Sequence, residues 1–214
     1  NWETELQPVA LISHTPNILM VPPNSTFNNV DDIIKASKNS SSFLTYGSAG
    51  VGSSIHLAGE LFQAMTGTKL THVPYRGATP AEQALMAGDI AMMFGSPSNA
   101  VGLIKADKLK AIAITGLDQI KALPQVPTLD QSGLKGFNVG ASYVLVAPAG
   151  VPANVLDRLS KAIEQINATE ETIAFNDRIY AIPMRGGPDK AKEFLQSEYQ
   201  KWKKLVEENN LKLD

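Results

Sequence analysis

The chain has 214 residues, of which 43% are hydrophobic and 19% charged, and its formal net charge is −2. These values predict an ordinary globular protein of one large domain or two smaller lobes, and the lack of a basic excess argues against nucleic-acid binding. The sequence has no cysteine, which excludes disulfides, zinc–thiolate sites and a cysteine nucleophile, and it has no apolar run long enough to span a membrane.

The first third of the chain begins with apolar strands and then changes to a strand–helix pattern. Pro8–Ile12 and Ile18–Val21 predict one long interrupted strand or a crossing segment. A short helix is expected over Val30–Ser37. A strand from Phe43 to Tyr46 then leads through a turn rich in glycine and serine into an amphipathic helix.

Helices and strands go on alternating as far as residue 114. Three more strands are expected, at Leu70–Val73, Asp89–Phe94 and Leu109–Ile114. Between the first two, Thr79 as N-cap and Glu82 three residues later predict a helix that begins with a capping box. This alternation with short links predicts a mostly parallel sheet covered by helices.

The last third of the chain begins with a second long apolar strand, Val139–Ala147. Helices are then expected to start near Pro152, Glu170 and Asp189. Two long strands that bracket a βα region indicate a protein of two lobes whose chain crosses the hinge twice.

Three strand-to-helix junctions, at residues 47–54, 75–79 and 95–97, are expected at the carboxyl ends of the strands, where open α/β sheets bind ligands. The first offers glycines that allow close approach, serine hydroxyls, and a helix N-terminus whose free N–H groups favour an anion. It is neither a P-loop nor a dinucleotide fingerprint, because no Lys-Ser/Thr follows its last glycine and its glycines have the wrong spacing. An ordinary βα turn without a ligand is the alternative.

Several side chains near these junctions have competing interpretations. His56 is expected to support the first junction from a buried position, with a ligand contact as the alternative. Arg76 has the fork geometry that suits a carboxylate, or is simply exposed. Tyr143 is expected to face the cleft. Glu60 and Asp89 are expected to be surface or supporting groups, since no second carboxylate or nucleophile pairs with either.

Five motifs in sequence order resemble the Bug-type receptors, the solute-binding proteins of tripartite tricarboxylate transporters. They are Tyr46–Glu60, His72–Gly77, Gly88–Phe94, Leu123–Thr128 and Leu145–Pro152. The resemblance implies a periplasmic receptor of the α/β class with the type II binding-protein fold, in which two lobes, each with a mostly parallel sheet covered by helices, close on a small carboxylate. It implies transfer of that carboxylate to membrane transporter subunits by a monomeric protein. No cofactor, metal or nucleic acid is expected.

The resemblance also assigns the lobes. Residues 1–22 and 139–214 match the C-terminal portion of lobe 1 with the hinge strands, and residues 23–138 match a complete lobe 2. The segment that begins lobe 1 in the family is expected to be missing from this sequence, and no signal peptide is among its residues, so the periplasmic location is implied by the resemblance alone.

In the family, main-chain N–H groups and serine hydroxyls of the first junction hold the carboxylate. The residues expected to bind ligand here are Tyr46, Ser48, Ala49, Gly50, Gly52, Ser53, Ser54, Tyr75, Arg76, Gly77, Gly95, Ser96 and Tyr143. The family commonly has Asp after the strand that ends in Phe94, where this chain has Gly95-Ser96. A dicarboxylate or aromatic acid is therefore expected rather than an amino acid.

Two other functions fit parts of the sequence. An enzyme acting on a carboxylate would need a nucleophile–base pair or a metal cluster, and neither is visible among three scattered histidines. A ligand-sensing regulatory domain of the same fold would carry a basic DNA-binding segment, which the sequence upstream of Asn1 would reveal.

Overall fold

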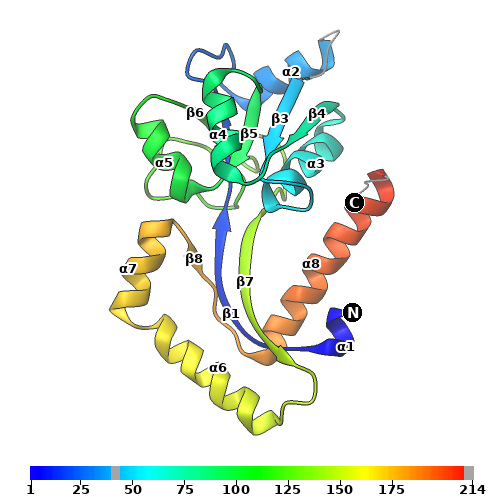
Figure 1. Cartoon of the computed structure of the whole chain (residues 1–214), viewed down its shortest axis with the longest axis vertical. Helices are drawn as coiled ribbons and strands as arrows, with labels where there is room; N and C mark the ends of the chain where they lie inside the picture. Colours follow the sequence, from blue (N-terminus) through cyan, green and yellow to red (C-terminus); the bar gives the residue numbers. More distant parts are fainter. Residues whose placement is uncertain (40–43, 210–214) are drawn as a thin grey trace. The chain divides into compact units, whose positions relative to one another are not determined.

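The structure, a computed structural model, describes residues 1–39 and 44–209 (Figure 1). Its contacts divide the described residues into a first unit, formed by residues 1–15 and 142–209, and a second unit, formed by the described part of Pro16–Ala141. The boundaries differ from the predicted ones at 22/23 and 138/139. Strand β2, Ile18–Val21, pairs with two strands of the second unit, and the Val139 N–H donates to the carbonyl of Thr115, so both segments belong there.

The second unit is built on a five-stranded sheet with the order β4-β3-β5-β2-β6. Its other strands are β3 Leu44–Ser48, β4 Leu70–Pro74, β5 Met92–Gly95 and β6 Lys110–Ile114. Strand β3 pairs in parallel with β4 and β5, whereas β2 runs antiparallel to β5 and β6. The predicted start of β3 at Phe43 lies outside the described residues, and β5 begins at Met92 rather than at Asp89.

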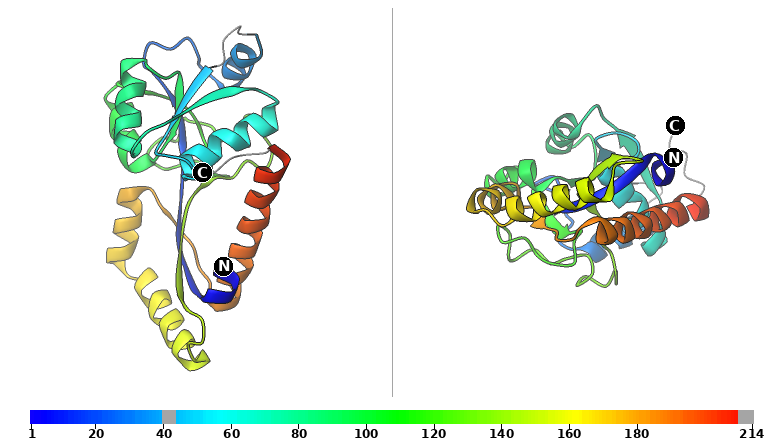
Figure 2. Two further views of the ribbon diagram at one scale, coloured as in Figure 1. Left: turned by 45° about the vertical axis from the view of Figure 1, so that its right-hand side comes forward. Right: turned by 90° about the horizontal axis from the view of Figure 1, so that it is seen from below.

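Four helices belong to this unit, and three of them leave the sheet at the carboxyl ends of strands. They are α2 Val30–Asn39, α3 Ser54–Thr66, α4 Ala78–Ala87 and α5 Pro97–Lys105. Helix α3 packs beside β3, β4 and β5 (Figure 2). The predicted capping box is wrong: α4 begins at Ala78, after Gly77 turns the chain with φ 112°, and no side chain caps it. Glu82 is therefore inside the helix, and its side chain is buried.

Strand β2 lies inside the sheet, between β5 and β6, and belongs to its buried core. All four of its residues are completely buried, as are Met92, Met93 and Phe94 on the neighbouring β5. The rings of Phe94 and of Phe62 on α3 lie 5.9 Å apart, which ties the helix to the sheet. A continuous apolar run that is buried on both faces is typical of a central strand covered by helices.

The first unit contains a three-stranded sheet with the order β7-β1-β8. Its strands are β1 Leu6–Pro16, β7 Gly140–Pro148 and β8 Ile182–Pro183, and its helices are α1 Trp2–Glu5, α6 Ala153–Asn167, α7 Glu170–Ile179 and α8 Pro188–Asn209. Strands β1 and β8 are antiparallel, a detail that the expectation of a mostly parallel sheet in each lobe did not include. Both unit boundaries fall within β1 and β7, which are the two predicted crossing strands.

Helices α6 and α7 leave much of their apolar surface exposed. Exposed side chains on the two helices are Val155, Leu159, Ile166, Ile173 and Phe175. The residues of α6 and α7 that are buried are both polar, Ser160 and Asn176. A small apolar core does form where Leu156 and Ile163 pack on Val9, Ala10 and Ala147.

Candidate functional site

The first predicted junction is a tight turn between β3 and α3. Gly50 and Gly52 have φ angles of 126° and 79°, which L side chains rarely adopt, so the glycines are required by the path of the backbone. The turn places the N-terminus of α3 directly after the end of β3. The helix dipole and the N–H groups of its first turn therefore point out from this edge of the sheet.

Ser48, at the end of β3, is completely buried and holds the turn from inside. Its Oγ accepts the N–H of Gly50 at 3.1 Å and lies 2.6 Å from Nε2 of His72. The same oxygen is 3.2 Å from the carbonyl oxygen of Gly50. These contacts occupy the hydroxyl, so Ser48 shapes the turn through bonds within the protein.

Ser53 also stabilises the turn through hydrogen bonds within the protein. As the N-cap of α3 its Oγ accepts the N–H of His56 at 3.2 Å, and it donates to the carbonyl of Gly50 at 2.7 Å. The first of these is the usual bond of a capping serine, and the second ties the start of the helix to the turn.

A different set of donors is left over at the start of α3. The hydroxyl of Ser54 and the main-chain N–H groups of Val51, Ser54 and Ile55 have no hydrogen-bond partner among the described residues. Ser54 is partly exposed and Val51 exposed. Four donors at a helix N-terminus, with no carboxylate from the described part of the chain bonded to them, form a place where an anion can bind.

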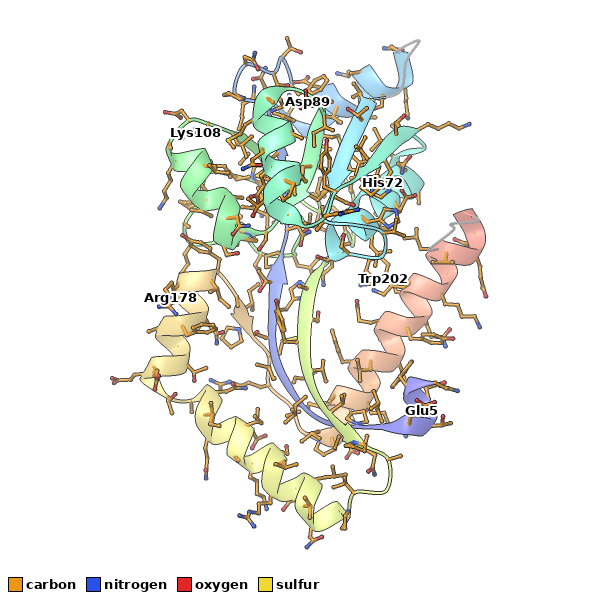
Figure 3. The ribbon with its side chains drawn as sticks, in the orientation of Figure 1. Glu5, His72, Asp89, Lys108, Arg178 and Trp202 are labelled. Carbon is orange, nitrogen blue, oxygen red and sulfur yellow. The ribbon has the colours of Figure 1, made fainter. Side chains whose placement is uncertain are left out.

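Three aromatic rings are stacked behind the turn. The His72 ring, labelled in Figure 3, is stacked on Tyr46, with centroids 4.9 Å apart, and on His56, with centroids 4.2 Å apart. The Nδ1 atom of His56 accepts the N–H of Gly52 at 3.1 Å. His56 is buried. The prediction that His56 supports the loop is therefore confirmed.

Among residues 1–39 and 44–209, Glu60 is the one carboxylate bonded to this stack. Its Oε1 accepts the hydroxyl of Tyr46 and the amide of Gln63, the latter at 3.0 Å, and lies 3.6 Å from Nε2 of His56. Glu60 thus has the supporting role that the sequence predicted. Tyr46 is fully buried and its hydroxyl is directed to Glu60.

Burial sets the charge of this cluster. It lowers the pKa of both histidines below the ordinary 6.5, that of His72 to about 4, where the neighbouring His56 adds to the effect. Glu60 opposes the shift in the pKa of His56. Burial and the hydrogen bond to Glu60 raise the pKa of Tyr46. At neutral pH both imidazoles are consequently uncharged.

The second junction is fastened to the first. The N–H of Tyr75 donates to the carbonyl of Ser48 at 2.9 Å, and that of Gly77 donates to the carbonyl of Ala49 at 3.2 Å. Tyr75 is half-buried. Arg76 is exposed and has no ion pair or hydrogen bond with any described residue.

The third junction follows β5, the other neighbour of β3. Gly95 is buried, and Ser96 is the N-cap of α5, with its hydroxyl 3.0 Å from that of Ser98. Strand pairing therefore brings all three junctions to one edge of the sheet. Tyr143 belongs to the first unit, where its side chain is exposed.

Sequence reasoning missed Glu82, which lies next to the third junction. Its Oε1 is buried without a hydrogen-bond partner, and a Cβ placed on Gly95 would be 3.7 Å from it. Burial raises the pKa of this carboxyl, while a hydrogen bond from Asn99 acts in the opposite direction. The sequence pattern predicted Glu82 to be a capping group. The helix begins earlier than predicted, so Glu82 lies inside it, and its side chain is buried.

Other places in the second unit are less suited to an anion. A cavity of about 460 Å³ is lined by Asn28, Lys110 and Gln125 among others, but the Lys110 ammonium already donates to Asn28 and to the carbonyl of Ser25. Within residues 1–39 and 44–209, no group of three or more His, Cys, Asp and Glu side chains could hold a metal ion. No helix in those ranges is both long and apolar enough to cross a membrane.

The fold is similar to that of periplasmic solute-binding proteins whose structures have been solved. BugD, a periplasmic binding protein, superposes with a TM-score of 0.82 at 26% identity over 97% of this chain and 70% of its own. An R. palustris protein solved with adipate gives 0.85 at 26% identity over 97% of this chain and 69% of its own. MatC from Rhodopseudomonas palustris, solved with malate, gives 0.81 at 27% identity over 94% of this chain and 69% of its own.

Residues 1–211 match the tripartite tricarboxylate transporter family receptor, and the chain belongs to that family. The resemblance drawn from the five motifs is confirmed, as is the fold class. A UPF0065 protein from the tcbD-tcbE intergenic region of a Pseudomonas species is 34% identical over 98% of this chain, and BugT of Bordetella pertussis is 27% identical over 98%. The chain spans 62% and 64% of the length of these two relatives.

Proposed function

We propose that this protein binds a small organic carboxylate at the first junction and passes it to a tripartite tricarboxylate-type transporter in the periplasm. The observation that carries the proposal is the set of four unbonded donors on Val51, Ser54 and Ile55 at the start of α3. Neutral donors hold a carboxylate without transferring a proton to it, which suits binding and release. Tyr75, Arg76, Gly77, Gly95 and Ser96 would border the same ligand.

In our proposal the predicted site residues have different roles, and their hydrogen bonds support the division. Ser54 and the N–H of Val51 contact the carboxylate in our proposal. Ser48 and Ser53 act through the turn that they stabilise, since their hydroxyls are already bonded. Tyr46 supports the turn through Glu60.

A dicarboxylate is the ligand class that we favour. Adipate and malate, found with two structural relatives, are both dicarboxylates. Gly95-Ser96 offers no acid to meet an ammonium group, and the nearby Glu82 is buried, with a pKa that burial raises. An amino acid would therefore lack a charged partner at this junction.

The first junction alone supplies only part of the affinity. A hydrogen bond to a charged group contributes about 1.5–3 kcal/mol, so two or three contribute about 5 kcal/mol. Micromolar affinity needs about 8 kcal/mol. The remaining contribution would come from lobe closure and from residues of lobe 1 such as Tyr143.

We propose further that the second unit is the complete lobe 2 and that the first unit is the C-terminal portion of lobe 1. The exposed apolar side chains of α6 and α7 support this assignment, because such a surface is normally covered in a finished lobe. The protein would then bind its ligand weakly as the 214-residue chain and tightly with the whole of lobe 1.

A thermal-shift screen of organic acids, followed by calorimetry, tests the function. Malate, adipate, benzoate and aspartate form a sufficient first panel. Ser54→Ala should weaken binding of a dicarboxylate, whereas Ser197→Ala, which removes an exposed hydroxyl on α8, should not. Equal affinity in both variants, or turnover of the acid, would contradict the proposal.

A further inference from the structure

The hydrogen bond between Gly52 and His56 fixes the protonation state of the histidine. A main-chain N–H can only donate, so Nδ1 of His56, 3.1 Å away, must present a lone pair. The ring in this structure is therefore neutral and carries its proton on Nε2. That proton faces Oε1 of Glu60 at 3.6 Å.

Gly52 is the residue through which this bond acts on the donors. It has a φ of 79° and stands between the N–H of Val51 and the N–H of Ser54. Loss of this bond would remove a restraint from the short segment that carries both donors. The lone pair of His56 thus holds the turn in the form that presents its donors outward.

A second proton on the ring would turn this attraction into repulsion. Protonated Nδ1 is a donor, and it would then face the donor N–H of Gly52. The charged ring would instead be drawn to Glu60, which lies on the same side as Nε2. The N–H of Gly52 therefore favours the neutral ring of His56, whereas the carboxylate of Glu60 favours the charged ring.

The titratable groups around the ring come from α3 itself, which carries Glu60, and from the strands packed against it. Strand β3 contributes Tyr46, whose hydroxyl is bonded to Glu60, and β4 contributes His72, stacked at 4.2 Å. Strand β5, Met92–Gly95, has no titratable side chain. Burial lowers the pKa of His56 and of His72, and Glu60 raises that of His56. Both rings are neutral at pH 7 and charge in acid.

We infer that His56 is a positioning residue for the anion site: its neutral ring holds Gly52 in the donor-presenting turn, and protonation of the ring releases the turn. The consequence for a ligand, which rests on the proposed function, is that acid weakens carboxylate binding through the protein and not only through the ligand's own titration.

Amide exchange in ¹⁵N-labelled protein tests the release of the turn without any ligand. We expect the Gly52 amide to be protected at pH 7.5 and to lose about tenfold in protection factor, the value of one hydrogen bond, as the His56 ring charges. Ring ¹⁵N shifts should show the Nε2–H tautomer at pH 7.5. An Nδ1–H tautomer, protection that persists after the ring has charged, or global unfolding before it charges would each overturn the inference.

Two variants make the test specific. His56→Asn keeps an acceptor near the position of Nδ1 that cannot titrate, so the Gly52 amide should stay protected at the acid pH where it loses protection in the natural protein. His14→Asn changes the histidine of the first unit and should leave the loss of protection unchanged. The same pH response in His56→Asn as in the natural protein would overturn the inference.

Adipate serves as the ligand in a second measurement. Its own titration is the same for both proteins, so the ratio of the affinity at pH 7.5 to that at an acid pH where the ring ¹⁵N shifts show His56 charged should be about tenfold larger for the natural protein than for His56→Asn. Equal ratios would overturn the inference. No adipate binding by either protein at pH 7.5 would contradict the proposed function, while the amide measurement would still decide the role of His56.

Discussion

The hydroxyl oxygen of Ser48 lies 2.6 Å from Nε2 of His72, in a part of the second unit where Ser48 has no exposure to solvent. A serine in a glycine-rich motif is usually expected to meet the ligand. Here the side chain bonds inward, and the donors that remain available belong to residues 51–55. The hydroxyl of Ser48 therefore stabilises the turn, whereas the donors of residues 51–55 remain available to a ligand.

Ser48→Ala should destabilise the protein by about 1–3 kcal/mol, because it leaves the N–H of Gly50 and Nε2 of His72 without their partner in the interior. Ser54→Ala should change stability by less than about 0.5 kcal/mol, since that hydroxyl has no partner among the described residues. Urea unfolding of both variants checks this. Equal losses would show that the two serines do not have the separate roles assigned here.

Gly59→Ala should destabilise the protein although alanine is the better helix former. A Cβ at this position of α3 would lie 2.3 Å from a ring carbon of Tyr46, which is fully buried and hydrogen-bonded to Glu60. Overpacking of this kind costs about 1–3 kcal/mol. Gly102→Ala in α5 has no atom within 4 Å and should gain about 1 kcal/mol. The opposite signs should appear in thermal unfolding; a gain in both would contradict the packing described for Tyr46.

Stability should fall as the pH is lowered from 6.5 toward 4. His72 has an ordinary pKa of 6.5 and a folded-state pKa of about 4, so the unfolded chain binds more protons within this window. Its contribution is complete above pH 6.5 and is lost as the pH approaches 4. His72→Asn should flatten the slope of unfolding free energy against pH. Thr71→Ala, an exposed change on the same strand, should keep the slope even if it lowers the stability at every pH.

The exposed apolar residues of α6 and α7 should contribute little to the stability of this chain. Replacing Ile173 and Phe175 by serine should cost less than about 1 kcal/mol and should reduce the binding of a hydrophobic dye. Ile163→Ala, which removes a side chain packed on the core of Val9 and Ala10, should cost about 1–2 kcal/mol. Similar losses in the two experiments would mean that α6 and α7 are covered in solution.

Much of this fold could be predicted from the sequence because its signals are local. Alternating helices and strands between residues 30 and 114 indicate a parallel sheet, and the Gly-Ser turn before α3 indicates a helix start. The antiparallel place of β2 between β5 and β6 could not be predicted, since an apolar run carries no information about its partners. The strand was therefore assigned to the wrong side of the unit boundary.

The candidate site, like the fold, could be predicted from the sequence only in part. Position in the motif identified the turn and also the buried support from His56. The motif did not show that the hydroxyls of Ser48 and Ser53 are already hydrogen-bonded. The partner of Ser48 is His72, which lies on another strand, and the partner of Ser53 is the carbonyl of Gly50, which the turn brings close. The capping box at Thr79 was wrong since a glycine at residue 77 starts the helix earlier.

The most direct test of carboxylate binding at the start of α3 is an amide chemical-shift titration with malate and adipate. We expect the largest changes at the amides of Val51, Ser54 and Ile55, with smaller ones near Gly77 and Ser96. Saturable changes centred instead on the cavity near Asn28 and Lys110, with residues 49–55 unaffected, would contradict the proposed site.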